Sequence, residues 1–242
     1  MDIVRGNEVS SEIKKILIIG VEKSGKTSFI GTMPRPILIF AGETGAEGRL
    51  GGQKDIDFVR CYDLKGEPKG AGFGRFEKNF RELMTMKDFP YKTVAIDPLS
   101  FFSDNIVDKI DRTNPGLRGS ASTFKFWDLI KTKHLEILSQ VLAMSEYVVV
   151  TSHVRLRDDE TTDKAMFLPD LNGSIRDSIG GWFDAVLFTS TKPMGDKVKY
   201  SIQAIPDARR KGGVRVPLGM EGLLGLEEEP DFAKIQAKLV KK

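Results

Sequence analysis

Short runs of consecutive apolar residues recur along the chain, separated by stretches in which apolar residues recur every three or four positions. Runs of this length, rich in isoleucine and valine, are typical of strands that are buried on both faces of a sheet. Strands that alternate with helices predict a mostly parallel sheet with helices on both faces. The predicted strands are 13–20, 35–42, the run around 58–62, 92–97, 147–152 and 184–190.

Two stretches, 76–87 and 124–144, have the spacing of helices that face a core. A short charged helix is also expected near 230–242. In the long stretch, the apolar residues at near-helical intervals are Phe126, Ile130, Leu135, Leu138 and Leu142.

The segment 196–205 alternates polar and apolar residues, as a half-exposed strand does, and predicts an antiparallel hairpin towards the C-terminus. Three segments are expected to be long loops: 111–123, 155–178 and 207–213. Long loops in a compact domain are usually functional or disordered, so these are the places to look for partners.

The 242 residues, 40% of them hydrophobic, suit one large α/β domain. No run reaches the roughly 18 apolar residues of a membrane span, and the first dozen residues lack a signal peptide's apolar stretch, so we expect a soluble, cytoplasmic protein. The net charge of +3 gives no general argument for nucleic acid. The one cysteine, Cys61, excludes an internal disulfide and is expected to be a buried bystander.

The segment 20–27, GVEKSGKT, fits the pattern G-x-x-x-x-G-K-[ST], and it follows an apolar strand and precedes a helical stretch. Gly20 and Gly25 let the backbone curl so that its amides point at phosphate oxygens. Lys26 would reach the β and γ phosphates, and Thr27 would offer its hydroxyl to Mg²⁺. The alternative is a glycine-rich turn that carries a lysine by chance. The expected nucleotide-binding residues are Gly20, Val21, Glu22, Lys23, Ser24, Gly25, Lys26, Thr27 and Ser28.

Two carboxylates follow predicted strands. Asp97 closes the strand 92–97, and a phosphoryl-transfer site needs a carboxylate for the magnesium shell, normally on a strand beside that of the phosphate loop. The alternative is a helix cap before Pro98, and the two roles are compatible. Glu43 follows the second strand and would polarise the attacking water if the strands are parallel, or it is an ordinary loop glutamate. ATP is expected rather than GTP because no N-K-x-D segment stands out.

The phosphate loop, Glu43, Asp97 and the segment VVVTSHVRL (148–156) together resemble the RecA-like ATPases. The chain is most similar to small phage-encoded RecA-like nucleotide-binding proteins associated with single-strand DNA annealing and recombination. The resemblance covers 13–219 and implies a RecA-like P-loop fold for that part. It leaves 1–12 as an N-terminal extension and 220–242 as a C-terminal tail with a short helix.

The resemblance implies roles for further residues. Glu43 would activate water, and His153 would sense the γ-phosphate and relay its presence to a DNA-binding loop. RecA-like proteins usually have glutamine at this sensor position, although the small phage proteins look similar to this chain in using histidine. A structural histidine is the alternative. Because such ATPases work as rings or filaments, the resemblance implies that cations complete a neighbouring subunit's site, here Arg209, Arg210 and Lys211, with a solvated turn as the alternative.

In RecA-like proteins, two loops line the DNA path. The corresponding loops here carry basic residues, and in the earlier loop these lie beside Phe124, Phe126 and Trp127, a combination suited to unpaired strands. Acidic residues interrupt the second loop, and Phe126 and Trp127 are alternatively core residues. Trp182 and Phe183 are expected to pack rather than stack on bases. The predicted nucleic-acid contacts are Arg112, Arg118, Lys125, Arg155, Arg157, Lys164 and Arg176.

The sequence therefore predicts a slow, DNA- or oligomer-stimulated ATPase with Mg²⁺ that binds single-stranded DNA and promotes annealing or strand exchange. Its expected partners are further copies of itself and a single-strand DNA-binding or replication protein. The alternative is a nucleotide switch that acts on a protein partner in phage replication or packaging without touching DNA. A small-substrate kinase is disfavoured because no acceptor-binding or lid motif is apparent.

Overall fold

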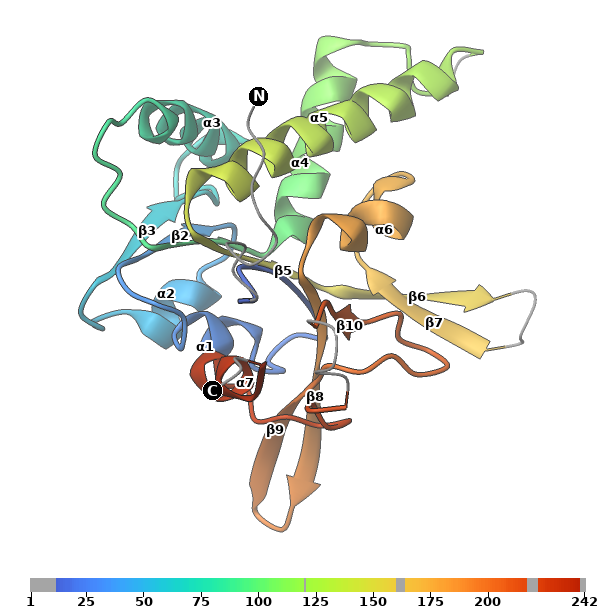
Figure 1. The fold of residues 1–242 in the computed structure, drawn as a ribbon. Helices are drawn as coiled ribbons and strands as arrows, with labels where there is room; N and C mark the ends of the chain where they lie inside the picture. Colours follow the sequence, from blue (N-terminus) through green and yellow to red (C-terminus); the bar gives the residue numbers. More distant parts are fainter. Residues whose placement is uncertain (1–11, 120, 160–163, 217–221, 240–242) are drawn as a thin grey trace, which may run out of the picture.

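The computed structural model describes residues 12–119, 121–159, 164–216 and 222–239 (Figure 1). The strands are β1 (Lys15–Ile19), β2 (Ile37–Ala41), β3 (Ile56–Arg60), β4 (Thr93–Asp97), β5 (Tyr147–Ser152), β6 (Val154–Asp159), β7 (Lys164–Pro169), β8 (Ala185–Met194), β9 (Lys197–Gln203) and β10 (Gly213–Val214). The helices are α1 (Lys26–Ile30), α2 (Gly45–Leu50), α3 (Ala71–Met84), α4 (Leu99–Thr113), α5 (Thr123–Met144), α6 (Ile175–Ser178), with a 3-10 turn at Ile179–Trp182, and α7 (Phe232–Leu239).

Within the described residues, eight strands form one sheet in the order β10, β8, β1, β5, β4, β2, β3, and β9 pairs with β8. The pairs among β8, β1, β5, β4, β2 and β3 are parallel. Only β9 and β10 run antiparallel to their neighbour β8. The predicted α/β class, with a mostly parallel sheet flanked by helices and an antiparallel hairpin towards the C-terminus, is therefore confirmed.

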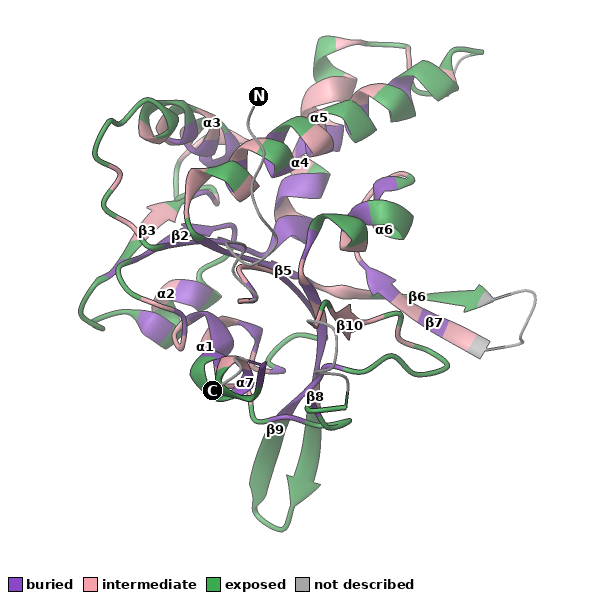
Figure 2. Cartoon of the chain, in the orientation of Figure 1, coloured by how far each residue is buried: buried purple, intermediate pink, exposed green. Residues whose placement is uncertain are grey.

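Successive side chains along the strands belong alternately to two separate buried apolar clusters, one on each face of the sheet. Leu17 and Phe40 face the cluster that also contains buried residues of α3, α4 and α5. Ile18 and Ile39 face the other cluster, which contains buried residues of α1, α2 and α7. Figure 1 shows these two groups of helices on opposite sides of the strands, and Figure 2 shows the sheet between them as the buried centre. Strands covered on both faces explain why they read as continuous apolar runs.

The parallel register aligns the carboxyl ends of four strands at one edge of the sheet. Ile19 of β1 lies opposite Ser152 of β5, and Ala41 of β2 lies opposite Asp97 of β4. The expectation that the strand of Asp97 lies beside the strand of the phosphate loop is wrong, because β5 lies between β1 and β4. Asp97 therefore reaches the phosphate loop from one strand further away than predicted.

The prediction that residues 155–178 form a long loop is wrong. The segment contains the antiparallel hairpin β6–β7 and the short helix α6. Apolar residues alternate in β7, where Met166 and Leu168 are buried. The preceding strand, β6, is rich in charged residues, so the segment as a whole resembles a loop in the sequence. The predicted loop 111–123 is also partly wrong, because its first three residues end α4, a helix that was not predicted.

The other expectations about packing can be compared directly. In α5, Phe126, Ile130 and Leu138 are buried, whereas Leu135 and Leu142 are half-buried. The thiol of Cys61 is buried and free, as expected. Phe183 is buried as expected, whereas 41% of Trp182 is exposed. In the part of the chain that the structure describes, no helix is both long and apolar enough to cross a membrane.

Candidate functional site

Two positions in the loop between β1 and α1 require glycine. Gly25, directly before α1, has a φ of 98°, in the left-handed region that glycine adopts without strain. At Gly20 the constraint is space, because a Cβ there would lie 1.8 Å from the hydroxyl oxygen of Thr189. The two glycines of the motif are thus required by the local structure for two different reasons.

The curled loop is held by hydroxyl groups. The Ser24 hydroxyl donates to the Val21 carbonyl at 2.6 Å and also lies 2.5 Å from the hydroxyl of Thr189 in β8. Both serine and threonine are buried. Thr189 had no predicted role, and its only signal in the sequence was a polar residue late in an apolar strand. The loop is therefore tied to β8 as well as to its own backbone.

Lys26 lies inside the loop. Its ammonium group donates to the carbonyls of Gly20 at 2.9 Å and Val21 at 2.8 Å, and only 6% of the residue is exposed. Burial lowers the pKa of Lys26, while Asp97 and Glu43 act in the opposite direction. The loop therefore presents a cation, close to two carboxylates, to whatever binds there.

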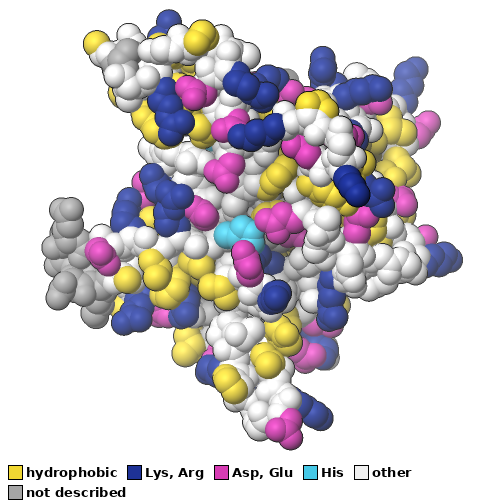
Figure 3. Space-filling view, turned by 180° about the vertical axis from the view of Figure 1, so that it is seen from behind, with side chains coloured by type: hydrophobic (Ala, Val, Ile, Leu, Met, Phe, Trp, Pro, Cys, Tyr) yellow, Lys and Arg dark blue, Asp and Glu magenta, His cyan; other side chains and the backbone are white. Residues whose placement is uncertain are grey.

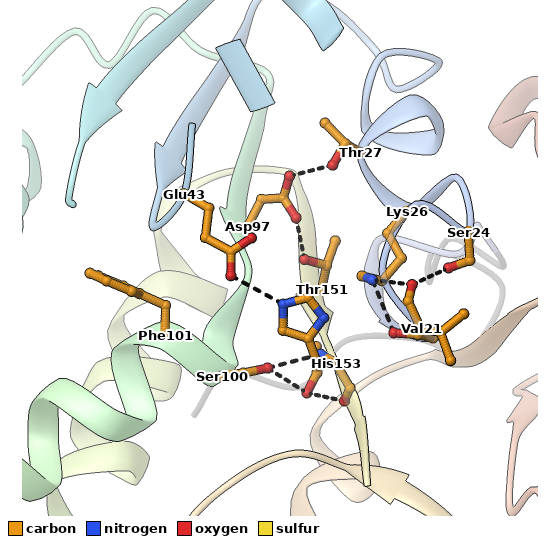
Figure 4. A network of polar contacts seen from close by, with 12 residues as sticks. Val21, Ser24, Lys26, Thr27, Glu43, Asp97, Ser100, Phe101, Thr151 and His153 are labelled. Atoms are coloured by element: carbon orange, nitrogen blue, oxygen red, sulfur yellow. Dashed lines mark hydrogen bonds and ion pairs between the residues drawn. The ribbon is translucent and has the colours of Figure 1, made fainter. Parts of the chain in front are cut away.

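Asp97 joins the loop to the centre of the sheet. Its carboxylate accepts a hydrogen bond from the Thr27 hydroxyl at 2.7 Å and another from the hydroxyl of Thr151 in β5 (Figure 4). Burial raises the pKa of Asp97, and the two hydroxyls and Lys26 partly offset this effect. The N-cap position of α4 is Pro98, and the hydrogen bonds of the Asp97 carboxylate come from Thr27 and Thr151.

This pair of oxygen ligands fits Mg²⁺. The ion commonly takes one or two protein oxygens and completes its shell with water and substrate phosphates. The Thr27 hydroxyl and the Asp97 carboxylate supply such oxygens. No group of three or more His, Cys, Asp or Glu side chains that could hold a metal by itself occurs among the described residues. Thr27 and Asp97 are thus the residues that would hold the ion.

Glu43 and His153 form a second polar pair at the same edge. The His153 Nε2 atom lies 3.1 Å from the Glu43 carboxylate, and the backbone amide of His153 donates to the Ser100 hydroxyl at 2.8 Å (Figure 4). A carboxylate only accepts hydrogen bonds, so Nε2 carries the proton when Glu43 is ionised. This hydrogen bond is the main reason that the pKa of Glu43 is lowered. The sequence predicted the two residues separately, without their contact.

These groups surround a cavity of about 720 Å³, within the size range of small-molecule sites. It brings together the predicted residues Lys26, Thr27, Glu43, Asp97 and His153. Residues that had no predicted role also line it, among them Arg49 of α2, Tyr200 of β9 and Pro230. Tyr200 and Pro230 lie far along the chain from the phosphate loop, so no local motif could have indicated them.

The predicted trans-acting cations lie away from this cavity. The Arg210 guanidinium donates to Gln203 at 2.8 Å and to Asp207 at 2.9 Å, and it lies 4.8 Å from the centre of a phenylalanine ring in β7. Arg209 and Lys211 are exposed, with no side-chain ion pair to the described residues. Their role in a neighbouring subunit stays a prediction.

Several predicted DNA-binding cations are paired with local carboxylates. Arg155 lies 2.7 Å from Asp170, and Arg157 lies 3.0 Å from Asp177. Of the remaining predicted contacts, Arg118 lies 3.7 Å from Asp111, Arg112 and Arg176 each donate to a backbone carbonyl, Lys125 is exposed, and the side chain of Lys164 is outside the described residues.

The two predicted DNA-binding segments lie next to each other. A Cβ at Gly173, in the turn after β7, would lie 3.7 Å from the ring of Trp127 in α5. Phe126 is fully buried, whereas Trp127 is 37% exposed and Phe124 is 84% exposed. The core alternative is thus confirmed for Phe126 only, and the start of α5 presents aromatic surface beside the base of the hairpin.

We expect Asp97→Asn to raise the unfolding temperature of the protein without nucleotide and to remove Mg²⁺-dependent nucleotide binding. Burial raises the pKa of Asp97. Above the ordinary carboxyl pKa, the ionised carboxylate therefore lowers the free energy of unfolding, because its charge is better solvated in the unfolded chain. A neutral amide should therefore stabilise the fold by about 1 kcal/mol.

Thermal unfolding with and without Mg²⁺ and ATP measures both effects. Asp128→Asn, an exposed substitution in α5, is the matched control and should change neither. A lower unfolding temperature for Asp97→Asn would show that the carboxylate stabilises the fold.

A family model described as an AAA domain matches residues 12–215 of the chain. Solved structures also match over most of the chain. A KaiC-like protein from the archaeon Pyrococcus horikoshii is 12% identical, with a TM-score of 0.41, over 79% of this chain and 78% of that chain. The flagellar accessory protein FlaH from Methanocaldococcus jannaschii is 10% identical, with a TM-score of 0.39 and the same coverage. None of the curated proteins matches the sequence.

Proposed function

The chain belongs to the AAA domain family of P-loop nucleotide-binding proteins, and on this premise we propose that it binds and slowly hydrolyses ATP with Mg²⁺. We propose further that the nucleotide controls binding to single-stranded DNA and thereby annealing or strand exchange in phage recombination. In this proposal the protein acts in the host cytoplasm as a ring or filament, together with a single-strand DNA-binding or replication protein.

The observation that carries the proposal of hydrolysis is the Glu43–His153 pair. The pair lies across the same cavity as Lys26 and the Thr27–Asp97 contact. Nucleotide binding alone needs the loop and the metal ligands, but it does not need a carboxylate at the end of β2 held by a histidine. A phosphoryl transfer to water needs a group that orients the water, and Glu43 is placed for that role.

The chain's own residues divide the work of this reaction. The loop amides and Lys26 hold the β and γ phosphates, and the bound magnesium ion would neutralise charge that develops on them. Glu43 accepts a hydrogen bond from the attacking water and orients it. Because its pKa is lowered, Glu43 is a weak base, so we assign it orientation and polarisation of the water rather than early proton removal.

The structure also supports a route from the nucleotide to the hairpin β6–β7. His153 lies between β5, which ends at Ser152, and β6, which begins at Val154. A γ-phosphate or a reoriented Glu43 that changes the hydrogen bond of His153 would act on the first residue of the hairpin. We propose that this contact makes DNA binding depend on the nucleotide.

In this proposal, arginine side chains of the hairpin leave their protein carboxylates and bind DNA phosphates instead. Arg155 and Arg157 are exposed on β6 and are held by Asp170 and Asp177. Exposed ion pairs of this kind contribute little to stability, so their exchange costs little. Phe124 and Trp127 nearby would stack on unpaired bases.

We expect the double variant Arg155→Gln, Arg157→Gln to bind single-stranded oligonucleotides about tenfold more weakly, with a salt dependence reduced by about two phosphate contacts. Gel shifts over a range of salt concentrations, with and without a nonhydrolysable ATP analogue, measure this. The matched control is Lys65→Gln, Lys87→Gln, which removes the same charge from exposed turns around α3. Binding by the wild type that ATP does not strengthen would contradict the proposed coupling.

One observation favours a second function, a nucleotide switch that acts on a protein partner. The predicted cations are largely paired, and Figure 3 shows basic and acidic side chains mixed over the face it displays rather than a broad basic surface. This function predicts no binding to oligonucleotides even at low salt and an ATPase rate that DNA does not change. ATPase turnover with and without single-stranded DNA separates the two functions.

A further inference from the structure

One wall of the nucleotide cavity has chemistry that phosphate binding does not require. Tyr200, from β9, and Pro230, from the segment before α7, both line the cavity but carry no charge. The phosphate loop, the metal ligands and the Glu43–His153 pair supply the charged and polar groups of the same lining. The cavity therefore has a polar part and a part with aromatic and apolar surface.

The register of β9 places Tyr200 over the phosphate loop. Alternate residues of a strand share a face, and Ile202 on this face is fully buried in the cluster that contains Phe29 of α1. Tyr200, two residues earlier, therefore meets the beginning of the same helix. Its ring lies against Gly25, where an added Cβ would be 3.2 Å from a ring carbon. Yet 44% of Tyr200 remains exposed, so the rest of the side chain is available to a ligand.

Pro230 is brought to the same place by an antiparallel bridge. Ile202 and Glu228 exchange two backbone hydrogen bonds, at 2.8 and 2.7 Å. Because the two segments run antiparallel, Pro230, two residues after Glu228, is brought level with Tyr200, two residues before Ile202. The Phe232 amide then donates to the Thr32 hydroxyl at 3.0 Å, which fixes the segment beyond Pro230.

We propose that Tyr200 and Pro230 form the surface against which the nucleoside of the bound nucleotide packs. The inference rests on the proposed nucleotide binding and adds how the base and sugar are held. Aromatic rings stack on any base, because every base has a π face. This wall therefore contributes affinity for the nucleoside of ATP and GTP alike.

The test compares ATP with inorganic tripolyphosphate, which has the phosphates without the nucleoside. Isothermal titration calorimetry, with Mg²⁺ throughout, gives both affinities for the wild type and for Tyr200→Ala. We expect the variant to bind ATP about tenfold more weakly, as loss of one stacking contact implies, and to bind tripolyphosphate as the wild type does. Tyr200→Phe should retain the affinity for ATP.

The matched control is Val198→Ala, which removes an exposed apolar side chain two residues along the same face of β9 and outside the cavity. It should change neither affinity. Unchanged ATP affinity in Tyr200→Ala would overturn the inference and leave nucleotide binding standing. Equal losses for both ligands would also overturn it, since Tyr200 would then support the loop through Gly25. A wild type that binds neither ligand would refute the proposed function itself.

Discussion

Replacement of Lys26 by alanine is expected to weaken ATP binding at least about 100-fold, since a charge-assisted contact with phosphate contributes about 3 kcal/mol. The ammonium group also bridges two carbonyls of the loop, so its loss removes both a ligand for the phosphates and a brace for their cradle. Titration of ATP in the presence of Mg²⁺ measures the effect.

Lys26→Met separates charge from structure, because it keeps an unbranched side chain of similar length. Burial lowers the pKa of Lys26, so removal of the buried charge offsets the loss of the two hydrogen bonds to the loop, and the methionine variant should unfold near the wild-type temperature. Micromolar ATP affinity retained in either variant would contradict the assignment of the phosphate loop.

The second large effect is expected for Glu43→Gln, which should lower kcat for ATP hydrolysis about 100-fold or more while ATP affinity changes little. Glutamine still accepts the hydrogen bond of His153, so the geometry is preserved, but it no longer polarises a water molecule with a negative charge. Single-turnover hydrolysis together with ATP titration separates the chemical step from binding.

Glu47→Gln is the matched control, four residues further along the chain. Its carboxylate is held by Arg60 and Tyr62, and it does not line the nucleotide cavity, so kcat should stay near that of the wild type. Hydrolysis by Glu43→Gln at the wild-type rate would eliminate the proposed role of Glu43.

The pH dependence of turnover provides a further check on Glu43. The hydrogen bond from His153 lowers the pKa of Glu43, so the carboxylate stays ionised through neutral and mildly acidic pH. As far as this group is concerned, kcat should therefore fall only below the ordinary pKa range of glutamate. An acidic limb near neutral pH that vanishes in Glu43→Gln would contradict this.

Elements with a strong local pattern could be predicted from the sequence. Strand β5 begins and ends where its apolar run does, and α5 begins one residue before the predicted start. The helix α4 was missed although Phe102 and Ile106 have helical spacing. The hairpin β6–β7 was missed because charged residues on an exposed strand resemble a loop when its partner strand is unknown.

The sequence by itself determined the phosphate loop, because a motif of backbone-shaping glycines, a lysine and a threonine is contiguous and its chemistry is local. It also determined that Asp97 ends a buried strand and that Glu43 follows one. Only the tertiary structure decided what these residues touch. Strand order inserted β5 between β1 and β4 and so supplied Thr151, and the pairing of β8 with β1 supplied Thr189.

The same holds for the wall formed by Tyr200 and Pro230 and for the contact between Glu43 and His153. These pairs are separated along the chain, and they meet because parallel register aligns strand ends and an antiparallel bridge returns the C-terminal segment to β9. Residue type sets what chemistry a side chain can do, whereas its partners depend on contacts between strands and segments that no local pattern encodes.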